Sequence, residues 1–189
     1  MYHALFGDAR FLSALLEIDR EMAAAAKAAG CGCGGVLHRG DYRRKPRGGP
    51  EGLGAEYGRR LSFCCAEEGC RKRRTPQSVR FLGWRVYLGV VVILGAAFEG
   101  GVTASRVRGL RELIGGSIDR RTLTRWVNWW RERLPRSRAW KGMAGLFYRS
   151  VSPKRMPLSL LELVSEDDAG MRVTRVLELL SGYGAGHAM

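Results

Sequence analysis

The stretches Cys31-Gly-Cys33-Gly-Gly35 and Cys64-Cys65-Ala-Glu-Glu-Gly-Cys70 together hold all five cysteines of this 189-residue chain. Cysteines that stay in a reducing cytoplasm rarely form disulfides, so two clusters of this kind favour a metal site. Buried free thiols are the alternative interpretation. We therefore expect a metal-clamped finger over residues 31–74, with helices on either side that support or present it.

Zinc takes four soft ligands in a tetrahedron, and two pairs of cysteines on neighbouring turns supply that geometry. The first pair is Cys31 with Cys33, a C-x-C spacing. The second pair is Cys70 with either Cys64 or Cys65. Side chains alternate along a strand, so only one of these two neighbours faces the metal. We select Cys65, because its C-x₄-C spacing to Cys70 lies within the usual range.

The predicted zinc site is structural, with Cys31, Cys33, Cys65 and Cys70 as its ligands. His38 is an alternative fourth ligand if one member of the first pair does not reach the metal. Four thiolates leave no open coordination position, so a catalytic zinc is disfavoured. The sequence also shows no nucleotide-binding loop, no Ser-His-Asp or Cys-His set and no evident pair of carboxylates. We therefore expect a protein without enzymatic activity.

The charge of the chain points to a polyanionic partner. The formal net charge is +14, from 32 basic and 18 acidic residues. Such a balance favours nucleic acid first and an anionic membrane second. The most apolar segment, Val86 to Phe98, is about 13 residues long, which is too short to cross a bilayer. It belongs to an apolar segment over Phe81 to Phe98, which is better interpreted as a buried helix that starts near Gly83 or Trp84, and we expect no membrane partner.

The start of the chain predicts a cytoplasmic protein rather than a secreted one, and the nucleic-acid partner that the charge favours makes it nucleoid-associated. Its apolar run is interrupted by Glu17, Asp19 and Glu21, and no basic signal-peptide start precedes it. Apolar residues at spacings of three and four predict a helix over Ala9–Ala29, and Gly30 is placed to end it. This helix leads into the first cysteine pair, or alternatively forms a dimer.

The remaining pattern is mainly helical, with a small β finger. We expect strands over Val36–Tyr42 and Arg60–Cys65, joined by a basic, glycine-rich loop over Arg43–Tyr57. Further helices are predicted over Ser105–Leu113, Asp119–Leu134, Ser137–Ser150, Leu158–Val164 and Met171–Leu180. The predicted division of the chain is 1–30 for the N-terminal helix, 31–80 for the finger, 81–150 for a helical domain and 151–189 for a capping or assembly segment.

Residues 102–133 have the pattern of a helix-turn-helix. Gly115-Gly116 forms the predicted turn, Ser117 caps the second helix, and Pro135 stops it. The apolar stripe of the second helix consists of Leu123, Val127, Trp130 and Leu134. Its polar face consists of Arg120, Arg121, Thr124, Arg125 and Asn128. The tryptophans within residues 126–130 are interpreted as core, although Trp129 could stack on single-stranded bases instead.

These residues resemble the zinc-ribbon plus helix-turn-helix portion of bacterial insertion-sequence transposases and their accessory proteins. The resemblance rests on Cys65-Ala-Glu-Glu-Gly-Cys70-Arg-Lys-Arg-Arg-Thr-Pro and on residues 102–133, and it covers residues 31–134. It implies DNA binding at the ends of a mobile element. It also implies zinc on the four selected cysteines and a groove-facing second helix. The acidic catalytic core of such transposases is not evident here.

The sequence thus predicts a zinc-stabilised protein that binds duplex DNA sequence-specifically. We expect the backbone of the DNA to be contacted by Arg43, Arg44, Lys45, Arg47, Arg71, Lys72, Arg73 and Arg74. The second predicted helix enters the major groove. An RNA-binding or ribonucleoprotein-assembly module is one alternative, and a protein-docking subunit of a larger complex is another. The N- or C-terminal helices could hold a protein partner or a second copy.

Overall fold

The computed structural model of the chain describes residues 2–44, 53–82, 86–87, 98, 100–114, 119–145, 147 and 151–185. Its helical segments are η1 (Tyr2–Phe6), α1 (Ala9–Ala28), α3 (Ala104–Ile114), α4 (Arg120–Asn128), the π-helical turn η2 (Trp129–Arg133), α5 (Leu134–Arg136), α6 (Arg138–Ala144), η3 (Pro153–Arg155), α7 (Leu158–Leu161) and α8 (Ala169–Ala185). Its strands are β1 (Leu37–Arg39), β2 (Tyr42–Arg43), β3 (Arg59–Arg60), β4 (Phe63–Cys65), β5 (Arg73–Arg74), β6 (Phe81–Leu82) and β7 (Val86–Tyr87).

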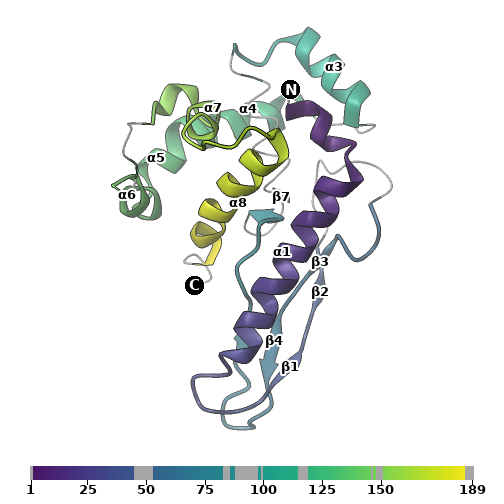
Figure 1. The fold of residues 1–189 in the computed structure, drawn as a ribbon, viewed down its shortest axis with the longest axis vertical. Helices are drawn as coiled ribbons and strands as arrows, with labels where there is room; N and C mark the ends of the chain where they lie inside the picture. The colour runs from purple at the N-terminus through teal and green to yellow at the C-terminus, as the bar shows by residue number, and fades with distance from the viewer. Residues whose placement is uncertain are drawn as a thin grey trace.

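The molecule is elongated, and α1 runs along its long axis (Figure 1). The N-terminal end of α1 lies beside a group of helices, here called the head, which consists of α3 to α8. The C-terminal end lies beside the short strands β1 to β5. Residues 31–44 and 53–80, which carry these strands, are here called the finger. The predicted class, mainly helical with a small β finger, is confirmed at this level.

Helix α1 forms where the sequence predicts it. The Asp8 carboxylate accepts hydrogen bonds from the backbone N–H groups of Arg10 and Phe11, at 2.8 and 3.3 Å, and so caps the first turn. Alanines of high helix propensity fill the last turns. Gly30 then adopts a φ of +67°, a left-handed conformation that glycine takes without strain and that ends the helix.

The finger contains two small antiparallel sheets. The first has the strand order β1-β4-β5, and the second pairs β2 with β3. The predicted strand over 36–42 is therefore divided, with a break at Gly40 and Asp41. The cause is local, since the Asp41 carboxylate accepts the backbone N–H of Ser62 at 3.0 Å. In a continuous strand pair that N–H would donate to a backbone carbonyl instead. The predicted strand over 60–65 is divided at the same place, into β3 and β4.

Two groups of buried side chains lie along α1. The smaller group, in the finger, consists of Ala23, Leu37, Leu61, Phe63 and Cys65. The larger group joins the head to the other half of α1 and includes Phe11, Leu15, Val79, Trp130 and Leu177. Helix α1 contributes to both groups, so it is the element that connects finger and head. The predicted boundaries at residues 30, 80 and 150 stay a prediction.

A fully buried ion pair fastens α1 to the end of the finger. Asp19 and Arg80 have no exposed side-chain surface, and Arg80 Nε lies 2.8 Å from Asp19 Oδ2. The carboxylate also accepts hydrogen bonds from Ser78 Oγ at 2.5 Å and from the Val79 N–H at 2.7 Å. The guanidinium donates to the carbonyl oxygens of Glu56, Tyr57 and Arg59. Both charges are thus paired and hydrogen-bonded, as burial requires.

The predicted helix over 105–113 is present as α3, and the one over 119–134 as α4 together with η2. The predicted apolar stripe of the second helix is buried along its whole length. The cap of α4 is Asp119, whose carboxylate accepts the N–H of Arg121 at 3.2 Å. The predicted turn at Gly115-Gly116 and the predicted cap Ser117 lie outside the described residues. The helix-turn-helix arrangement therefore stays a prediction.

The predicted end of this helix at Pro135 is wrong. The helical path continues through η2 and α5 to Arg136. Proline normally ends a helix because it lacks an N–H and its ring clashes with the carbonyl four residues back. Here the N–H of Leu134 instead donates to the carbonyl of Trp129, five residues back, in a wide π-type turn just before the proline. The path ends at Ser137, whose hydroxyl caps α6 through the N–H of Trp140 at 3.1 Å.

The predicted buried helix that starts near Gly83 or Trp84 is wrong at Val86–Tyr87, where the structure describes it. Phe81–Leu82 and Val86–Tyr87 pair as two antiparallel strands, β6 and β7. Residues 88–97 lie outside the described part of the chain. A short apolar run does not separate a buried strand from a buried helix, and here tertiary pairing decides for the strand. Among the described residues, no helix combines the length and the apolar character that crossing a bilayer would require.

Candidate metal centre

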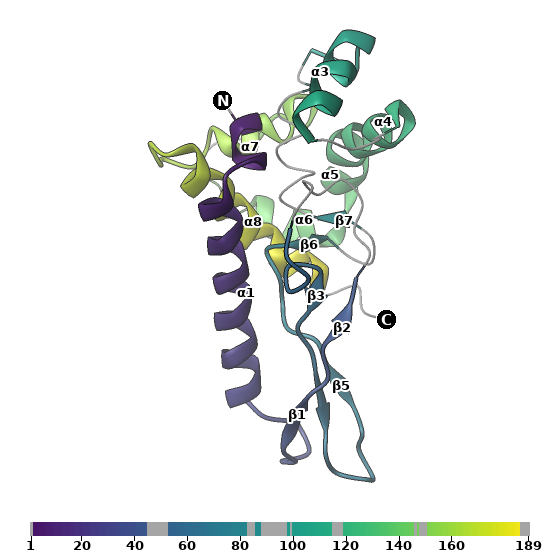
Figure 2. The same cartoon turned by 90° about the vertical axis from the view of Figure 1, so that its right-hand side faces the viewer.

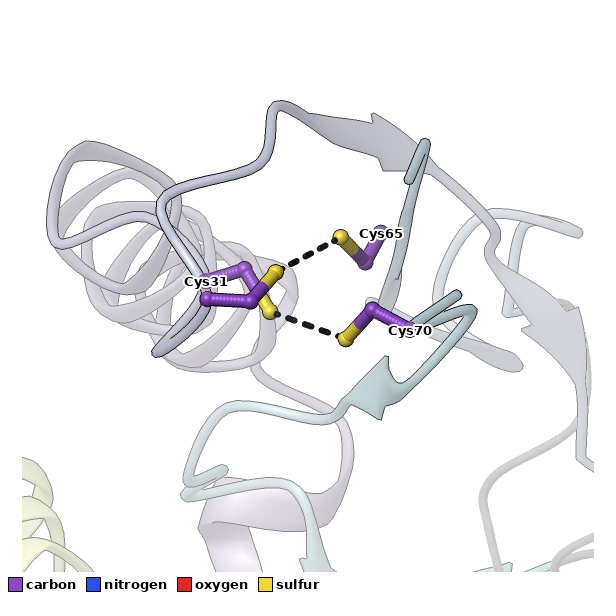
Figure 3. Close-up of side chains that lie close together, drawn as sticks. Cys31, Cys65 and Cys70 are labelled. Carbon is purple, nitrogen blue, oxygen red and sulfur yellow. Dashed lines mark hydrogen bonds between the residues drawn. The ribbon is translucent and has the colours of Figure 1, made fainter. Parts of the chain in front are cut away.

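Four cysteine side chains converge at the end of the finger. Cys31 and Cys33 lie in the loop after α1, Cys65 ends β4, and Cys70 lies in the turn before β5 (Figure 3). Their four Sγ atoms all lie within 4.8 Å of one another. The Cys31–Cys70 and Cys33–Cys65 sulfur distances are 3.7 and 3.5 Å. A tetrahedron with metal–sulfur bonds of about 2.3 Å has edges of about 3.8 Å, so the cluster is positioned to hold a metal ion.

Tight turns bring the two pairs into place. Gly34, with a φ of +83°, donates its N–H to the carbonyl of Cys31 at 2.9 Å, which closes the turn that carries the first pair. On the other side, the N–H groups of Cys70 and Arg71 both donate to the carbonyl of Glu67, at 3.0 and 2.9 Å. This second turn lifts Cys70 back towards Cys65. Despite the short C-x-C spacing, the first turn directs the thiols of both Cys31 and Cys33 into the cluster.

Backbone N–H groups support the sulfurs. The backbone N–H groups of Cys33, Glu67 and Lys72 each act to lower the pKa of the cysteine two positions earlier, namely Cys31, Cys65 and Cys70. Hydrogen bonds from backbone N–H groups favour the thiolate over the thiol and fix its direction.

The ionisation of these thiols is unequal. Hydrogen bonds from the backbone and the side chain of Cys33 lower the pKa of Cys31 to about 7. At Cys65 the hydrogen bond from Glu67 lowers the pKa, but burial and the neighbouring thiols outweigh it and raise the pKa to about 12. A second negative charge beside the first is unfavourable in so small a volume. A multivalent cation would reverse that balance and allow all four thiolates together.

A glycine makes room for the cluster. A Cβ atom added at Gly35 would lie 2.8 Å from Cys65 Sγ and 3.3 Å from Cys33 Sγ, and it would overlap Glu67 Cγ. Such distances are shorter than van der Waals contact, so the sulfurs would have to move. Gly32, in the same loop, faces open space and has no positive φ. The two glycines thus form a matched pair for substitution.

We expect Gly35→Ala to weaken metal retention and Gly32→Ala to leave it unchanged. The added methyl group displaces Cys65 Sγ by several tenths of an ångström, and outer-sphere changes of this kind typically cost about 10–100-fold in metal affinity. Competition with a coloured chelator measures the affinity of both variants. Equal affinities for the two variants would contradict the tight packing described around Gly35.

The fifth cysteine lies outside the cluster. Cys64 is on the opposite face of β4 from Cys65, and it faces His38 across the β1–β4 pair. His38 is exposed and is not part of the cluster. Of the alternatives that the sequence left open, the structure therefore brings together Cys31, Cys33, Cys65 and Cys70. The identity of the metal stays a prediction.

The residues predicted to bind nucleic acid occupy two regions. On the finger, Arg43 is exposed, Arg44 is half-buried, and Lys45 and Arg47 lie outside the described residues. Residues 71–74 are all exposed. On α4 every residue of the predicted polar face is exposed, namely Arg120, Arg121, Thr124, Arg125 and Asn128. The structure does not bring the two regions together, because the head and the finger lie near opposite ends of α1 (Figure 1).

Some of these side chains also have structural partners. Arg73 donates to the Gly40 carbonyl at 2.8 Å and to Ser62 Oγ at 3.2 Å. Arg74 donates to the carbonyl of Gly30 at 2.6 Å and so ties β5 to the end of α1. Trp129 is half-buried and packs edge-on against Trp130, with ring centroids 4.9 Å apart. The tryptophans at the end of α4 are thus core, as predicted, and its arginines are the surface.

The Asp19–Arg80 pair was not predicted, although the sequence carries a signal for it. Asp19 stands at the i+4 spacing of Phe11, Leu15 and Ala23, all of which are buried on one face of α1. A carboxylate within such a stripe requires a buried cation. Arg80 is the first basic residue after Pro76, at the point where the chain leaves the finger.

Comparison with known proteins does not assign the chain to a family. No family model matches it, and no curated protein and no solved structure is significantly similar to it. The resemblance to the DNA-binding portion of insertion-sequence transposases therefore stays a prediction, carried by the residues quoted for it.

Proposed function

We propose that this protein is a zinc-stabilised nucleic-acid-binding protein that binds duplex DNA, without catalytic activity of its own. The cysteine cluster holds the finger in shape, and α4 lies in the major groove. The resemblance to the DNA-binding portion of insertion-sequence transposases suggests a role at the ends of a mobile element. The location that follows is cytoplasmic, in association with the nucleoid.

Zinc is the proposed metal because of the donor set. Four thiolates in a tetrahedron favour zinc or iron, and four-cysteine sites of this kind in small fingers are typically structural zinc sites. When bound, the ion supplies charge neutralisation and crosslinks the loop after α1 to the β4–β5 turn. Four thiolates fill the coordination sphere of the ion and leave no position for a substrate or a reactive water. The site therefore fits a structural role.

The observation that carries the DNA proposal is the basic face of α4. Among the described residues, no carboxylate pairs with Arg120, Arg121 or Arg125, although all three are exposed. The opposite face is held rigidly by the buried stripe that includes Leu123 and Val127. A rigid helix whose arginines carry uncompensated charge is suited to phosphate and guanine contacts in a major groove.

We expect Arg121→Ala with Arg125→Ala to weaken binding to a duplex at least about tenfold, because each lost contact typically costs about 1–3 kcal/mol. The charge-matched control is Arg10→Ala with Lys154→Ala, two exposed cations on other elements. Fluorescence anisotropy at several salt concentrations measures the affinities. If about six phosphates are neutralised, the log–log slope with salt is roughly −5. Equal losses in the two double variants would contradict a specific role for α4.

The same titration distinguishes RNA from DNA. A-form duplexes have a deep, narrow major groove that does not admit a helix, so duplex RNA should compete poorly. Single strands should also compete poorly, because Trp129 is packed against Trp130 and is not available to stack on bases. Stronger competition by structured RNA than by duplex DNA would favour the ribonucleoprotein alternative. Copurification with a protein, without nucleic acid, would favour a docking subunit.

A further inference from the structure

We propose that the finger and α4 contact the same DNA duplex about one helical turn apart, with Arg43 and Arg59 as the phosphate-binding point of the finger. The inference rests on the proposed function and adds to it a length for the binding site and a residue, Arg59. It makes α1 the element that connects the two separate contacts.

The first support is a pair of like charges in the finger. Arg43 and Arg59 are directly opposite each other in the register of β2 and β3. Both are exposed, and among the described residues neither has a carboxylate partner. Like charges placed opposite each other across a strand pair are destabilising. A phosphate group between or beside the two guanidinium groups would relieve this repulsion.

The second support is a set of ordered cations on the other face of β2, where Tyr42 and Arg44 alternate with Arg43. The ring of Tyr42 is flanked by Arg44 and Arg73, whose guanidinium carbons lie 4.9 and 5.4 Å from its centroid. Arg44 donates to the Tyr42 hydroxyl at 2.9 Å, and Arg73 is held by Gly40 and Ser62 as described. Guanidinium groups stacked on a ring lose less freedom when they bind a phosphate. The finger thus carries positive charge whose direction is fixed before binding.

The third support is the spacing. Helix α1 has 20 residues, so it is about 30 Å long at 1.5 Å per residue. The head contacts its N-terminal half, and the finger contacts its C-terminal half. Figure 2 shows α4 and the strands β2 and β5 on the same side of the molecule, away from α1. One turn of B-form DNA is about 34–36 Å, comparable with the length of α1, along which the head and the finger are arranged.

The test is the dependence of affinity on duplex length, measured by anisotropy with duplexes of about 10, 14, 18 and 22 base pairs. Affinities are corrected for the number of registers that each duplex offers. We expect a rise of at least about tenfold between the shortest duplex and the 18-mer, because the second contact becomes intramolecular. Arg43→Ala with Arg59→Ala should abolish that rise and keep the affinity for the shortest duplex. This double substitution should not unfold the finger, since it removes a repulsion.

The control Arg10→Ala with Lys154→Ala should show the same rise as the unmodified protein. The α4 variant Arg121→Ala with Arg125→Ala should weaken binding at every length. A flat length dependence in the unmodified protein, or an undiminished rise in the finger variant, would overturn the two-contact proposal while leaving DNA binding intact. An absence of binding to every duplex would remove the proposed function itself. Tighter binding to a structured RNA than to any duplex would overturn the choice of DNA.

Discussion

Cys65→Ser is expected to abolish metal binding and to unfold the finger. Cys65 is the most buried of the four clustered cysteines, and its sulfur lies 3.5 Å from that of Cys33. The small group of buried side chains around Phe63 offers too little apolar area to hold the finger alone. In such modules the site forms only in the folded state, so the free energy of metal binding contributes directly to the free energy of folding. Metal content should fall from about one ion per chain to below about 0.1, and amide protection in the finger should be lost.

The neighbouring cysteine supplies the control. Cys64→Ser changes a thiol on the same strand in the same way, but on the face that points away from the cluster. This variant should keep its metal and its amide protection. Loss of metal in Cys64→Ser alone would show that Cys64 and not Cys65 is the ligand, and loss in both variants would contradict a site that needs only Cys65 of the two.

Asp19→Ala is expected to destabilise the protein by about 3–5 kcal/mol, because it leaves the buried charge of Arg80 without its partner. Two further donors, Ser78 Oγ and the Val79 N–H, would also lose their acceptor. Thermal or urea unfolding measures the free energy of unfolding. Since α1 joins finger and head beside this pair, both parts should lose protection together.

Two variants control for the loss of charge and for the loss of packing. Glu21→Ala lies on the exposed side of the same helix and should change the stability by less than about 0.5 kcal/mol. Asp19→Leu combined with Arg80→Met replaces both charges with apolar groups, which commonly costs little. We expect this double variant to be more stable than Asp19→Ala. A small effect of Asp19→Ala would contradict the description of Arg80 as fully buried.

The regular helices could be predicted because each carries its own periodic pattern and local end signals. Helix α1 has Asp8 before it and Gly30 after it, and the apolar stripe that begins in α4 continues without a break to Leu134. The cysteine cluster could be predicted for a similar reason, since strand alternation and spacing select Cys65 over Cys64. Each of these signals is local, although the two cysteine pairs that meet in the cluster are more than 30 positions apart.

The features that were not predicted depend on residues that are far apart or on how they pack. Asp19 and Arg80 are 61 positions apart, and no local pattern links them. The pairing of β6 with β7 needs tertiary support, because two residues on each strand carry no recognisable period. The π-type turn before Pro135 depends on how Trp130 and Leu134 pack into the core.

The opposition of Arg43 and Arg59 is also a matter of register. In the sequence Arg43 belongs to a basic run, and its strand partner is not apparent there. The antiparallel pairing of β2 with β3 places the two guanidinium groups on one face of the pair. Charge composition alone thus indicates a polyanionic partner, whereas the fold indicates where unrelieved positive charge collects.

A cluster of four cysteines positioned to hold a metal ion is the central feature of this structure. The metal content of the full chain, purified without added metal, can be measured by elemental mass spectrometry. We predict about one zinc ion per chain, with loss of amide protection in the finger when a chelator removes it. A chain that contains no metal and keeps a protected finger would contradict the proposed role of the four cysteines.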